Sequence, residues 1–563
     1  MRKLKKALAV LLSAAMVLGM SSMAFAEPEA ANRGDRTADS TIKVQELAKG
    51  DVVTYYQVIE WVDSKGWAFK APFDSLSEDD LKEITGTPAV GTTPAVPGKI
   101  TQDMAKKIAA AATSGGTTDP ALTGNTWTKS GAEAGLYMVV IAAGTSGVVY
   151  NPVFVAVDFD RNDTNTLDIS TASYSNAGIA KKKVITVEKT EKVREKKLQQ
   201  AIDAYAGQVV DFDIKTTIPV YLPTFTDPSF VITDSVTEGI ELDPDSITVT
   251  LDPAAAAGDT AYTIDPKAAG FTITFDGDYL KANTVPVEVT VNYSGEITNK
   301  AAYNINQDKN TVEVTYSNGP GDEKGALKDI SNTYTFSIGA LVLGSTQEDE
   351  KTSELVKVGI DQNGEYITEL REETYPGIET VGVLPGATYR LSTDSNAETA
   401  YVNGLYPKGA EFTTGVDGIV TFKGLSAGTY YITEIDAPDG YIRDKKVYKV
   451  VIEAEFNDPV KVTEQIDDID VSYEVVTLKT SSVKIYDDET LIGENTYTAT
   501  NKGPTTTTSS STTQSTELKN VAGAELPATG GIGTTIFYIL GSILVIGAGV
   551  ILVARRRMGS IQE

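Results

Sequence analysis

Five residues near the C-terminus, Leu526-Pro-Ala-Thr-Gly530, stand in a setting that no folded domain requires. They precede a 19-residue segment without charge, from Ile536 to Ala554, which is followed directly by Arg555-Arg-Arg557. At ~1.5 Å per helical residue this segment spans ~28 Å, close to the ~30 Å hydrocarbon core of a bilayer. A short motif, a membrane span and a basic tail in this order predict that other machinery acts on the chain as its substrate.

Both ends of the chain indicate export. Residues 1–26 begin with basic side chains, continue as an apolar run and end in Ala24-Phe25-Ala26, as a secretory signal peptide does. The arginine triplet is expected to stay on the cytoplasmic side, which leaves the preceding chain outside. The mature protein then begins with a mobile tail, residues 27–41.

The composition excludes several kinds of chemistry. The 563 residues include no histidine and no cysteine, which removes Ser-His-Asp and thiol-histidine catalysis, imidazole metal sites and disulfides. The formal net charge of −28 argues against nucleic-acid binding. Paired carboxylates, as in a glycosidase, remain an alternative, but no such pair stands out. We therefore expect no enzyme, no cofactor and no metal.

The mature chain is expected to be mainly β, with tandem immunoglobulin-like sandwiches. Apolar and polar residues alternate in many segments, which is typical of half-buried strands. Glycine and proline separate these segments at short intervals, as antiparallel sandwiches require. The clearest examples are Ile247–Leu251, Phe271–Phe275, Val287–Val291 and Val312–Tyr316.

Helix signals are confined to the first third of the chain. Ser77 can cap a helix from Glu78 to Ile84, and Thr101 can cap one that places Met104 and Ile108 on a single face. We expect three folded units, followed by a Thr/Ser-rich stretch too poor in apolar residues to pack. The predicted boundaries are 42–183, 184–326 and 327–502 for the units, 503–525 for the linker, 526–530 for the motif, 531–554 for the membrane helix and 555–563 for the tail.

The C-terminal signal resembles the LPxTG sorting signal of Gram-positive surface proteins. In that family a sortase recognises the motif, here Leu526, Pro527, Thr529 and Gly530. The resemblance implies cleavage between Thr529 and Gly530, an acyl-enzyme at Thr529, and release by an amine that becomes an amide. The membrane helix would serve as a transient anchor.

The third unit resembles the Cna-B sandwiches of Gram-positive pilins and adhesins. The matching segments are Leu384-Pro-Gly-Ala-Thr-Tyr-Arg-Leu391, Gly424-Leu-Ser-Ala-Gly-Thr-Tyr430 and Thr433-Glu-Ile-Asp-Ala-Pro-Asp-Gly-Tyr441. The resemblance implies a self-made Lys–Asn isopeptide bond, with Glu434 as the catalytic residue. It assigns Lys357 as the lysine and Asn501, ahead of the linker, as the last-strand asparagine. The alternative is a surface lysine in a domain without the bond.

The physical chemistry of this bond requires three residue types to meet in a core. Burial disfavours the charged ammonium, so a buried lysine becomes a neutral amine that can attack a carboxamide. A carboxyl group that burial keeps protonated can polarise the amide oxygen. Proximity lowers much of the remaining barrier, so folding itself triggers the reaction.

The middle unit resembles the Cna-A-like central domain of SpaA-type shaft pilins. Val231-Ile-Thr-Asp-Ser-Val-Thr-Glu-Gly-Ile240 and Lys309-Asn-Thr-Val-Glu-Val-Thr-Tyr-Ser-Asn318 match its pattern. The resemblance selects Lys189 on the first strand, Asp234 as the catalytic residue and Asn310 at the start of the last strand. A link closing a loop of about 120 residues would stabilise the fold by ~5 kcal/mol. Alternatively, these are ordinary strand and turn residues.

Shaft pilins also carry a lysine at the junction of their first two units, which accepts the threonyl group of the next subunit. The matching position here is Lys181, with Lys182 and Lys183 as neighbours. Ile179-Ala180 replaces the family's Tyr-Pro, which leaves the choice among the three lysines open. A literal Tyr406-Pro-Lys408 lies in the third unit and makes Lys408 a further alternative.

These observations predict the major shaft subunit of a covalent, cell-wall-anchored pilus that supports adhesion. Its expected partners are identical subunits, minor tip and base pilins, a class C pilin sortase, a housekeeping sortase and peptidoglycan. The alternative is a monomeric wall-anchored adhesin with the same sorting signal. Two weaker signals remain: an Arg33-Gly34-Asp35 tripeptide in the tail, and a partial calcium-loop spacing that begins at Asp158.

Overall fold

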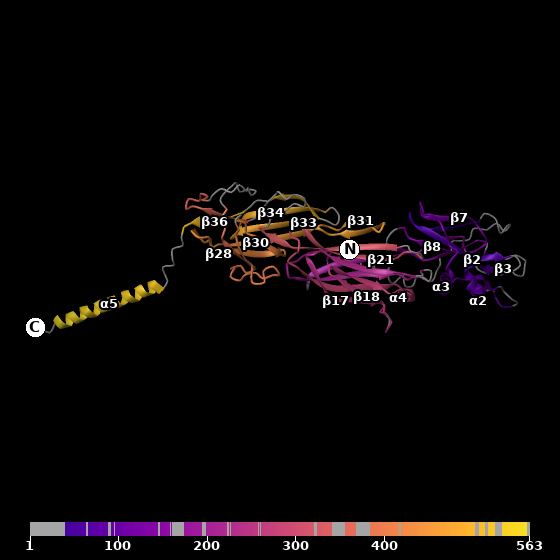
Figure 1. Cartoon of the computed structure of the whole chain (residues 1–563), viewed down its shortest axis with the longest axis horizontal. Helices are drawn as coiled ribbons and strands as arrows, with labels where there is room; N and C mark the ends of the chain where they lie inside the picture. Colours follow the sequence, from indigo (N-terminus) through magenta and orange to yellow (C-terminus); the bar gives the residue numbers. More distant parts are fainter. Residues whose placement is uncertain are drawn as a thin grey trace. The chain divides into compact units, whose positions relative to one another are not determined.

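The computed structural model describes residues 40–559 with internal gaps, the longer ones being 160–173, 340–354, 368–382 and 524–531. The chain forms two compact units (Figure 1). The first comprises Met1–Thr335, Ala454–Thr480 and Ala499–Thr507, and the second comprises Phe336–Glu453, Ser481–Thr498 and Thr508–Glu563. The signal peptide, the Arg33 tripeptide, the calcium-loop candidates Asp158, Asp160, Asn162 and Asp168, and the sorting motif lie outside the described residues.

The N-terminal domain is built on two main sheets, with strand orders β11-β1-β7 and β10-β8-β2-β3. Two apolar clusters fill it, one of which receives Ile84, Met104 and Ile108 from the helices. Its strands are β1 (Ser40–Gln45), β2 (Val52–Val62), β3 (Gly66–Phe69), β4 (Gly86–Thr87), β5 (Val96–Pro97), β6 (Thr117–Thr118), β7 (Thr126–Ala132), β8 (Gly135–Ala142), β9 (Val148–Tyr150), β10 (Val153–Val157), β11 (Ala177–Ile179) and β12 (Lys182–Val184).

Both predicted helices of this domain are confirmed. Helix α2 (Glu78–Thr85) has Ser77 as its N-cap in a reciprocal capping box with Asp80, and α3 (Gln102–Ala111) has Thr101 as its N-cap. These side chains accept hydrogen bonds from amide groups that have no partner within the helix. A short 3-10 helix, η2 (Phe73–Ser75), precedes them.

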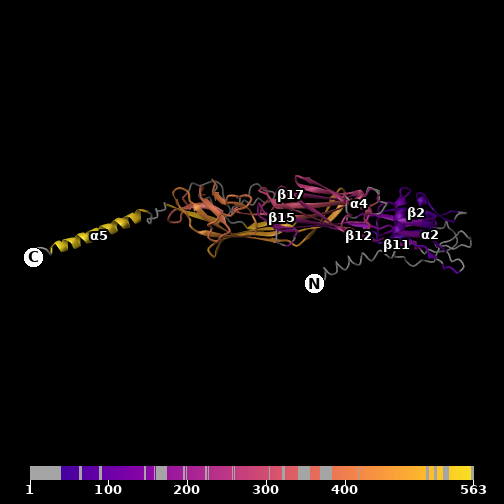
Figure 2. The ribbon, with the colours of Figure 1, turned by 90° about the horizontal axis from the view of Figure 1, so that it is seen from below.

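The middle domain is a sandwich of two sheets, with orders β13-β15-β20-β17 and β14-β22-β21-β16-β19-β18 (Figures 1 and 2). All four predicted strand segments are confirmed, within β17, β19, β20 and β21. The strands are β13 (Val187–Val193), β14 (Ala201–Asp203), β15 (Val209–Ile218), β16 (Phe230–Val236), β17 (Ile240–Asp252), β18 (Tyr262–Lys267), β19 (Gly270–Phe275), β20 (Val287–Ile297), β21 (Gln307–Ser317) and β22 (Lys324–Tyr334).

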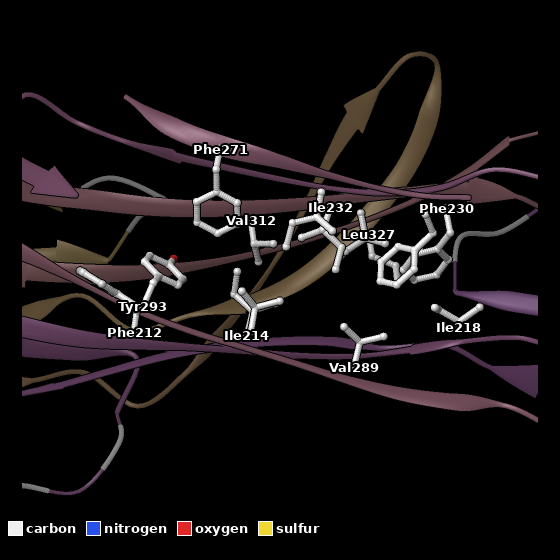
Figure 3. Packing of buried hydrophobic residues seen from close by; sticks show 14 of the residues in the cluster. Phe212, Ile214, Ile218, Phe230, Ile232, Phe271, Val289, Tyr293, Val312 and Leu327 are labelled. Atoms are coloured by element: carbon white, nitrogen blue, oxygen red, sulfur yellow. The ribbon is translucent and has the colours of Figure 1, made fainter. Parts of the chain in front are cut away.

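Alternating side chains of the two sheets build one continuous core (Figure 3). In β20 every second residue from Val287 to Ile297 is buried, so one face of the strand packs inward. Tyr293 lies on this inner face beside Phe212 and Phe271, with ring centroids 5.2 Å and 4.9 Å away. The core is therefore aromatic and closely packed where the two sheets meet.

The third domain comprises a seven-stranded sheet, β26-β25-β28-β30-β33-β34-β35, and smaller sheets with orders β24-β36-β29 and β23-β27. Strand β36 lies between β24, to which it is parallel, and β29. The strands are β23 (Phe336–Ile338), β24 (Leu355–Ile360), β25 (Thr388–Ser392), β26 (Glu411–Thr413), β27 (Phe422–Leu425), β28 (Gly428–Asp436), β29 (Tyr441–Ile442), β30 (Val447–Phe456), β33 (Leu478–Asp487), β34 (Thr490–Asn501), β35 (Thr506–Thr512) and β36 (Thr516–Ala522).

A hairpin between β30 and β33 belongs to the first compact unit. Its strands, β31 (Val460–Ile466) and β32 (Ile469–Val475), pack on β22 through Val471, Tyr473 and Val475. Lys328 of β22 lies 2.6 Å from the Glu464 carboxylate of the hairpin. The hairpin thus covers an outer face of the middle domain's second sheet.

Three sequence predictions need correction. The boundary at residue 326 falls inside β22, which pairs with β21 and completes the middle domain. Helix signals were expected only in the first third of the chain, but helix α4 (Gly277–Ala282) also forms, where Asp276 caps two amide groups. The predicted linker is partly folded, because residues 506–512 and 516–522 form β35 and β36.

The C-terminal helix α5 (Ile532–Gly559) agrees with the expected membrane span (yellow in Figure 1). Within it, Tyr538–Arg556 has a mean hydropathy of 2.1 and is fully exposed. Its length and apolar composition suit it to lipid.

Strand β36 generates a first prediction. An exported chain that ends at residue 502 lacks the middle strand of the β24-β36-β29 sheet, so its third domain is expected to unfold and to become protease-sensitive. A chain that ends at Gly523 keeps the strand and is expected to remain folded. Thermal unfolding and limited proteolysis compare the two. Equal stability would mean that the stretch acts as a linker after all.

Candidate functional site

The middle domain brings the three predicted residues together in its core. Lys189, on β13, and Asp234, on β16, form a fully buried ion-pair contact between the two sheets. Asn310, on β21, is also completely buried. Asp234 follows Phe230 and Ile232 on the inner face of β16, and Asn310 lies between Asp308 and Val312 on the inner face of β21, so strand alternation brings both polar groups into the core.

A fourth residue, Tyr293 on β20, connects the other three. Its hydroxyl accepts a hydrogen bond from Nζ of Lys189 at 2.5 Å and one from Nδ2 of Asn310 at 3.0 Å. It donates to Oδ2 of Asp234 at 2.7 Å. Tyr293 was not among the predicted site residues, because its position in an alternating strand is that of an ordinary core aromatic.

Electrostatics in this core favour neutral partners. Burial lowers the pKa of Lys189 and raises the pKa of Asp234, and each shift is only partly opposed by the attraction between them. Burial also raises the pKa of Tyr293 well above its usual value, so the phenol keeps its proton. Lys189 is thereby disposed to be an amine and Asp234 a carboxylic acid.

The backbone of Lys189 is held from the opposite sheet. Its N–H donates to Oδ2 of Asp329, on β22, at 2.6 Å, on the edge of β13 where Glu191 exchanges two backbone hydrogen bonds with Gln199. Burial raises the pKa of Asp329 to about 7. The contact fixes β13 between the two sheets and directs the side chain of Lys189 into the core.

Asn310 was predicted on the last strand, and the structure corrects this placement. It lies on β21, and β22 follows as the domain's final strand, with Asn310 paired to Ser331. Oδ1 of Asn310 and Oδ1 of Asp234 are both buried without a hydrogen-bond partner in the described structure. The expected contact between the carboxyl group and the amide oxygen is therefore not formed.

A second group of the same composition lies in the third domain. Nζ of Lys357, on β24, lies 3.2 Å from Oε1 of Glu434, on β28, and both side chains are fully buried. Nζ also donates to the hydroxyl of Tyr389, on β25, at 2.8 Å. Burial lowers the pKa of Lys357 to about 8. The predicted lysine and carboxyl group are thus side by side.

The asparagine of this group is Asn520, which replaces the predicted Asn501. Oδ1 of Asn520 accepts a hydrogen bond from Nζ of Lys357, and its Nδ2 donates to Oε1 of Glu434 at 3.0 Å. Asn520 lies on β36, the parallel neighbour of β24, whereas Asn501 ends β34 in the seven-stranded sheet. The alternation of buried Thr516, Leu518 and Asn520 with charged residues was the sequence signal that could have identified this strand.

The backbone around Lys357 is fixed on its other edge. Its N–H donates to the carbonyl of Gly418 at 2.7 Å, and its carbonyl accepts from Leu384 at 2.8 Å. Gly418 has φ +68°, and a Cβ there would lie 2.9 Å from the carbonyl oxygen of Lys357. Glycine permits this approach, which holds β24 in register beside β36.

The lysines at the junction of the first two domains differ in exposure. Lys181 and Lys182 are exposed, and Lys183 is half-buried, with a pKa that burial lowers to about 8. Lys408, the alternative in the third domain, is also exposed. Among the described residues no cluster of three or more carboxylates is placed to hold a metal ion.

Three segments match protein-family models. Residues 206–320 match the Gram-positive pilin backbone subunit 2, Cna-B-like domain, where the sequence motifs had suggested a Cna-A-like domain. Residues 377–466 match the SpaA prealbumin-like fold domain, and residues 519–558 match the LPXTG cell wall anchor motif.

Similar proteins agree with these matches. The trypsin-resistant surface T6 protein of Streptococcus pyogenes serotype M6 is 23% identical over 471 residues, which cover 75% of this chain and 79% of the relative. The solved T6 backbone pilin of that serotype has a TM-score of 0.51 at 16% identity, covering 86% of this chain and 99% of its own. The major pilin SpaD of Corynebacterium diphtheriae has a TM-score of 0.42 at 17% identity, covering 73% and 90%. The mainly β, tandem-sandwich fold is confirmed.

Glu191, two residues from Lys189, generates a pH-dependence prediction. Burial raises its pKa from 4.5 to about 8, against the lowering effect of hydroxyl donors from Ser331 and Thr333. The folded state holds this proton more tightly than the unfolded state does, because burial disfavours the charged carboxylate. The resulting contribution to folding stability is complete below pH 4.5 and is lost as the pH rises towards about 8.

The variant Glu191→Gln is therefore expected to gain about 1–3 kcal/mol of stability relative to the natural chain when the pH rises from 5 to 8. Thermal unfolding of the exported chain at the two pH values measures this. The matched control is Glu188→Gln on the exposed face of the same strand, which should change nothing. A parallel pH dependence for Glu191→Gln and the natural chain would contradict the shift.

Proposed function

Because the chain is an LPXTG-anchored backbone pilin, we propose that it is the repeating shaft subunit of a covalent pilus. A pilin sortase joins Thr529 of one copy to a junction lysine of the next, and internal Lys–Asn isopeptide bonds brace each copy. The observation that carries the proposal is the occurrence of two buried Lys–Asn–carboxyl groups in successive domains of a chain with a sorting signal.

The donor side of the polymer is the sorting signal. Helix α5 holds the exported chain at the membrane while the sortase cleaves the Thr529–Gly530 bond and retains Thr529 as an acyl-enzyme. An amine of another copy then attacks the acyl-enzyme, forms an amide with the Thr529 carbonyl and releases the enzyme. The last copy is transferred by a housekeeping sortase to peptidoglycan, and minor pilins occupy the tip and the base.

The acceptor side is the lysine group between the first two domains. Lys181 is our choice because its side chain is exposed and the backbone next to it is held, its carbonyl accepting a hydrogen bond from the Asn151 amide at 2.9 Å. Lys183 is less accessible, although its lowered pKa gives it more free amine at neutral pH. Exposure takes precedence here, since the amine has to enter the active site of another protein.

The internal bonds follow from the same amine chemistry. Nζ of each buried lysine attacks Cγ of its asparagine, a new C–N bond forms, and the bond from Cγ to Nδ2 breaks. Nδ2 leaves as ammonia, having gained one proton that Nζ loses. The lowered lysine pKa values supply the neutral amine, and Asp234 and Glu434 lie where they can transfer the proton.

Intact mass of the exported chain tests both internal bonds. The natural chain is expected to weigh less than its sequence predicts by two ammonia molecules. Asn310→Ala and Asn520→Ala are each expected to retain one of the two bonds. Asn501→Ala serves as the control and should lose two ammonia molecules like the natural chain. An unchanged mass for the natural chain would defeat the bond assignments.

Polymerisation is tested in cells that express the chain with its sortases. Wall extracts in denaturing electrophoresis are expected to show a ladder for the natural chain and a single band for Lys181→Arg, because a guanidinium stays charged and does not attack an acyl-enzyme. Lys182→Arg, Lys183→Arg and Lys408→Arg should keep the ladder. A single band from the natural chain would instead indicate a monomeric wall-anchored adhesin.

A further inference from the structure

The two buried groups differ in how far their carboxyl side chains reach. In the third domain, Oε1 of Glu434 lies 3.2 Å from Nζ of Lys357 and accepts a hydrogen bond from Nδ2 of Asn520 at 3.0 Å. One carboxyl oxygen therefore contacts both the attacking nitrogen and the nitrogen that leaves. Proton transfer between the two needs no other group.

Asp234 cannot make the same bridge in the middle domain. Its side chain is one methylene shorter, and Oδ2 contacts Nζ of Lys189 and the Tyr293 hydroxyl. The amide nitrogen of Asn310 instead donates to the Tyr293 oxygen at 3.0 Å. The path from the carboxyl group to the leaving nitrogen thus passes through the phenol.

The placement of Tyr293 suits a relay. Phe212 and Phe271 pack against its ring, so the hydroxyl is held at the meeting point of the two sheets (Figure 3). Burial keeps the phenol protonated, and a neutral hydroxyl can donate one proton while it accepts another. All three of its polar neighbours take part in the proposed reaction.

We propose that Tyr293 is a catalytic residue of bond formation in the middle domain, where it relays a proton from Asp234 to the leaving nitrogen of Asn310. This inference rests on the proposed internal bonds. The pair of Asp234 and Tyr293 does there what Glu434 does alone in the third domain.

The proton transfers balance without another reactant. The neutral amine of Lys189 attacks Cγ of Asn310, and the carbonyl electron pair moves to Oδ1. Asp234 gives its proton to the phenol oxygen while Tyr293 gives its own proton to Nδ2. The oxyanion then reforms the carbonyl and expels Nδ2 as ammonia, and Nζ returns a proton to the carboxylate of Asp234. Tyrosine and aspartic acid end as they began.

The third domain supplies an internal control. The Tyr389 hydroxyl accepts a hydrogen bond from Nζ of Lys357 at 2.8 Å, whereas the leaving amide nitrogen of Asn520 donates directly to Glu434. Removing the Tyr389 hydroxyl leaves the carboxyl bridge in place. Tyr293→Phe and Tyr389→Phe therefore remove the same atom from two buried lysine sites, of which only the first needs a relay.

The test follows the mass of the exported chain over time after purification, with peptide mapping to assign each bond. Tyr389→Phe is expected to lose two ammonia molecules at the rate of the natural chain. Tyr293→Phe is expected to form the third-domain bond normally and the middle-domain bond at least about ten-fold more slowly, as for loss of a general acid–base group. Circular dichroism verifies that each variant is folded.

A rescue variant separates proton relay from packing. Asp234→Glu combined with Tyr293→Phe restores a carboxyl group long enough to reach Nδ2 of Asn310, and is expected to recover the middle-domain bond at least in part. Failure to recover it would indicate that Tyr293 only packs the core. If Tyr293→Phe forms the middle-domain bond as fast as the natural chain does, the relay is overturned but the internal bonds are not. If the natural chain loses no ammonia, the internal bonds are overturned as well.

Discussion

The structure depends on placing a lysine side chain where water does not reach it. Lys189 and Lys357 are both completely buried, and an isolated ammonium in such a place would be strongly destabilising. In each domain a carboxyl group and a phenol contact the lysine nitrogen, and a buried amide belongs to the same hydrogen-bonded group. Backbone contacts hold the lysine strand on the edge away from its paired strand. The same burial that makes the lysine unfavourable as an ion makes it reactive as an amine. Burial of the lysine therefore determines both the stability of the domain and the reactivity of the amine.

The two sites reach a similar composition by different topologies. In the middle domain, lysine and tyrosine come from one sheet and aspartate and asparagine from the other, so a bond would join the two sheets across the core. In the third domain, lysine and asparagine lie on neighbouring parallel strands, and the tyrosine and glutamate face them from the larger sheet. The chemistry thus requires a set of contacts and not one particular strand order.

Much of this arrangement could be predicted from the sequence. Asp234 and Asn310 stand at inward positions of alternating strands, in phase with Ile232 and Val312, and the motif around Glu434 is specific enough to identify its role in the resemblance. Asn520 was missed because threonine and serine dominate the chain before it, and such a composition is typical of a linker. Strand β36 forms by pairing with β24 and β29, which are distant in the sequence. The two tyrosines were missed because a tyrosine whose hydroxyl acts in a site has the same sequence pattern as one whose ring only packs in the core. The difference lies in the polar side chains around the hydroxyl, which come from distant strands.

The order of the strands also determines which parts of a subunit would be under tension in a pilus. If force enters at Lys181 and leaves at Thr529, the proposed internal bonds would shorten its path, because they would carry it from Lys189 to Asn310 and from Lys357 to Asn520. The strands of the N-terminal domain that precede Lys181 lie outside that path, whereas β12 (Lys182–Val184), which pairs with β9 of the same domain, lies on it. Within the middle domain the force still passes along the β21–β22 hairpin, because Asn310 lies on the penultimate strand. The β31–β32 hairpin packs on β22, so it covers the part of the middle domain that the proposed bond would leave under tension.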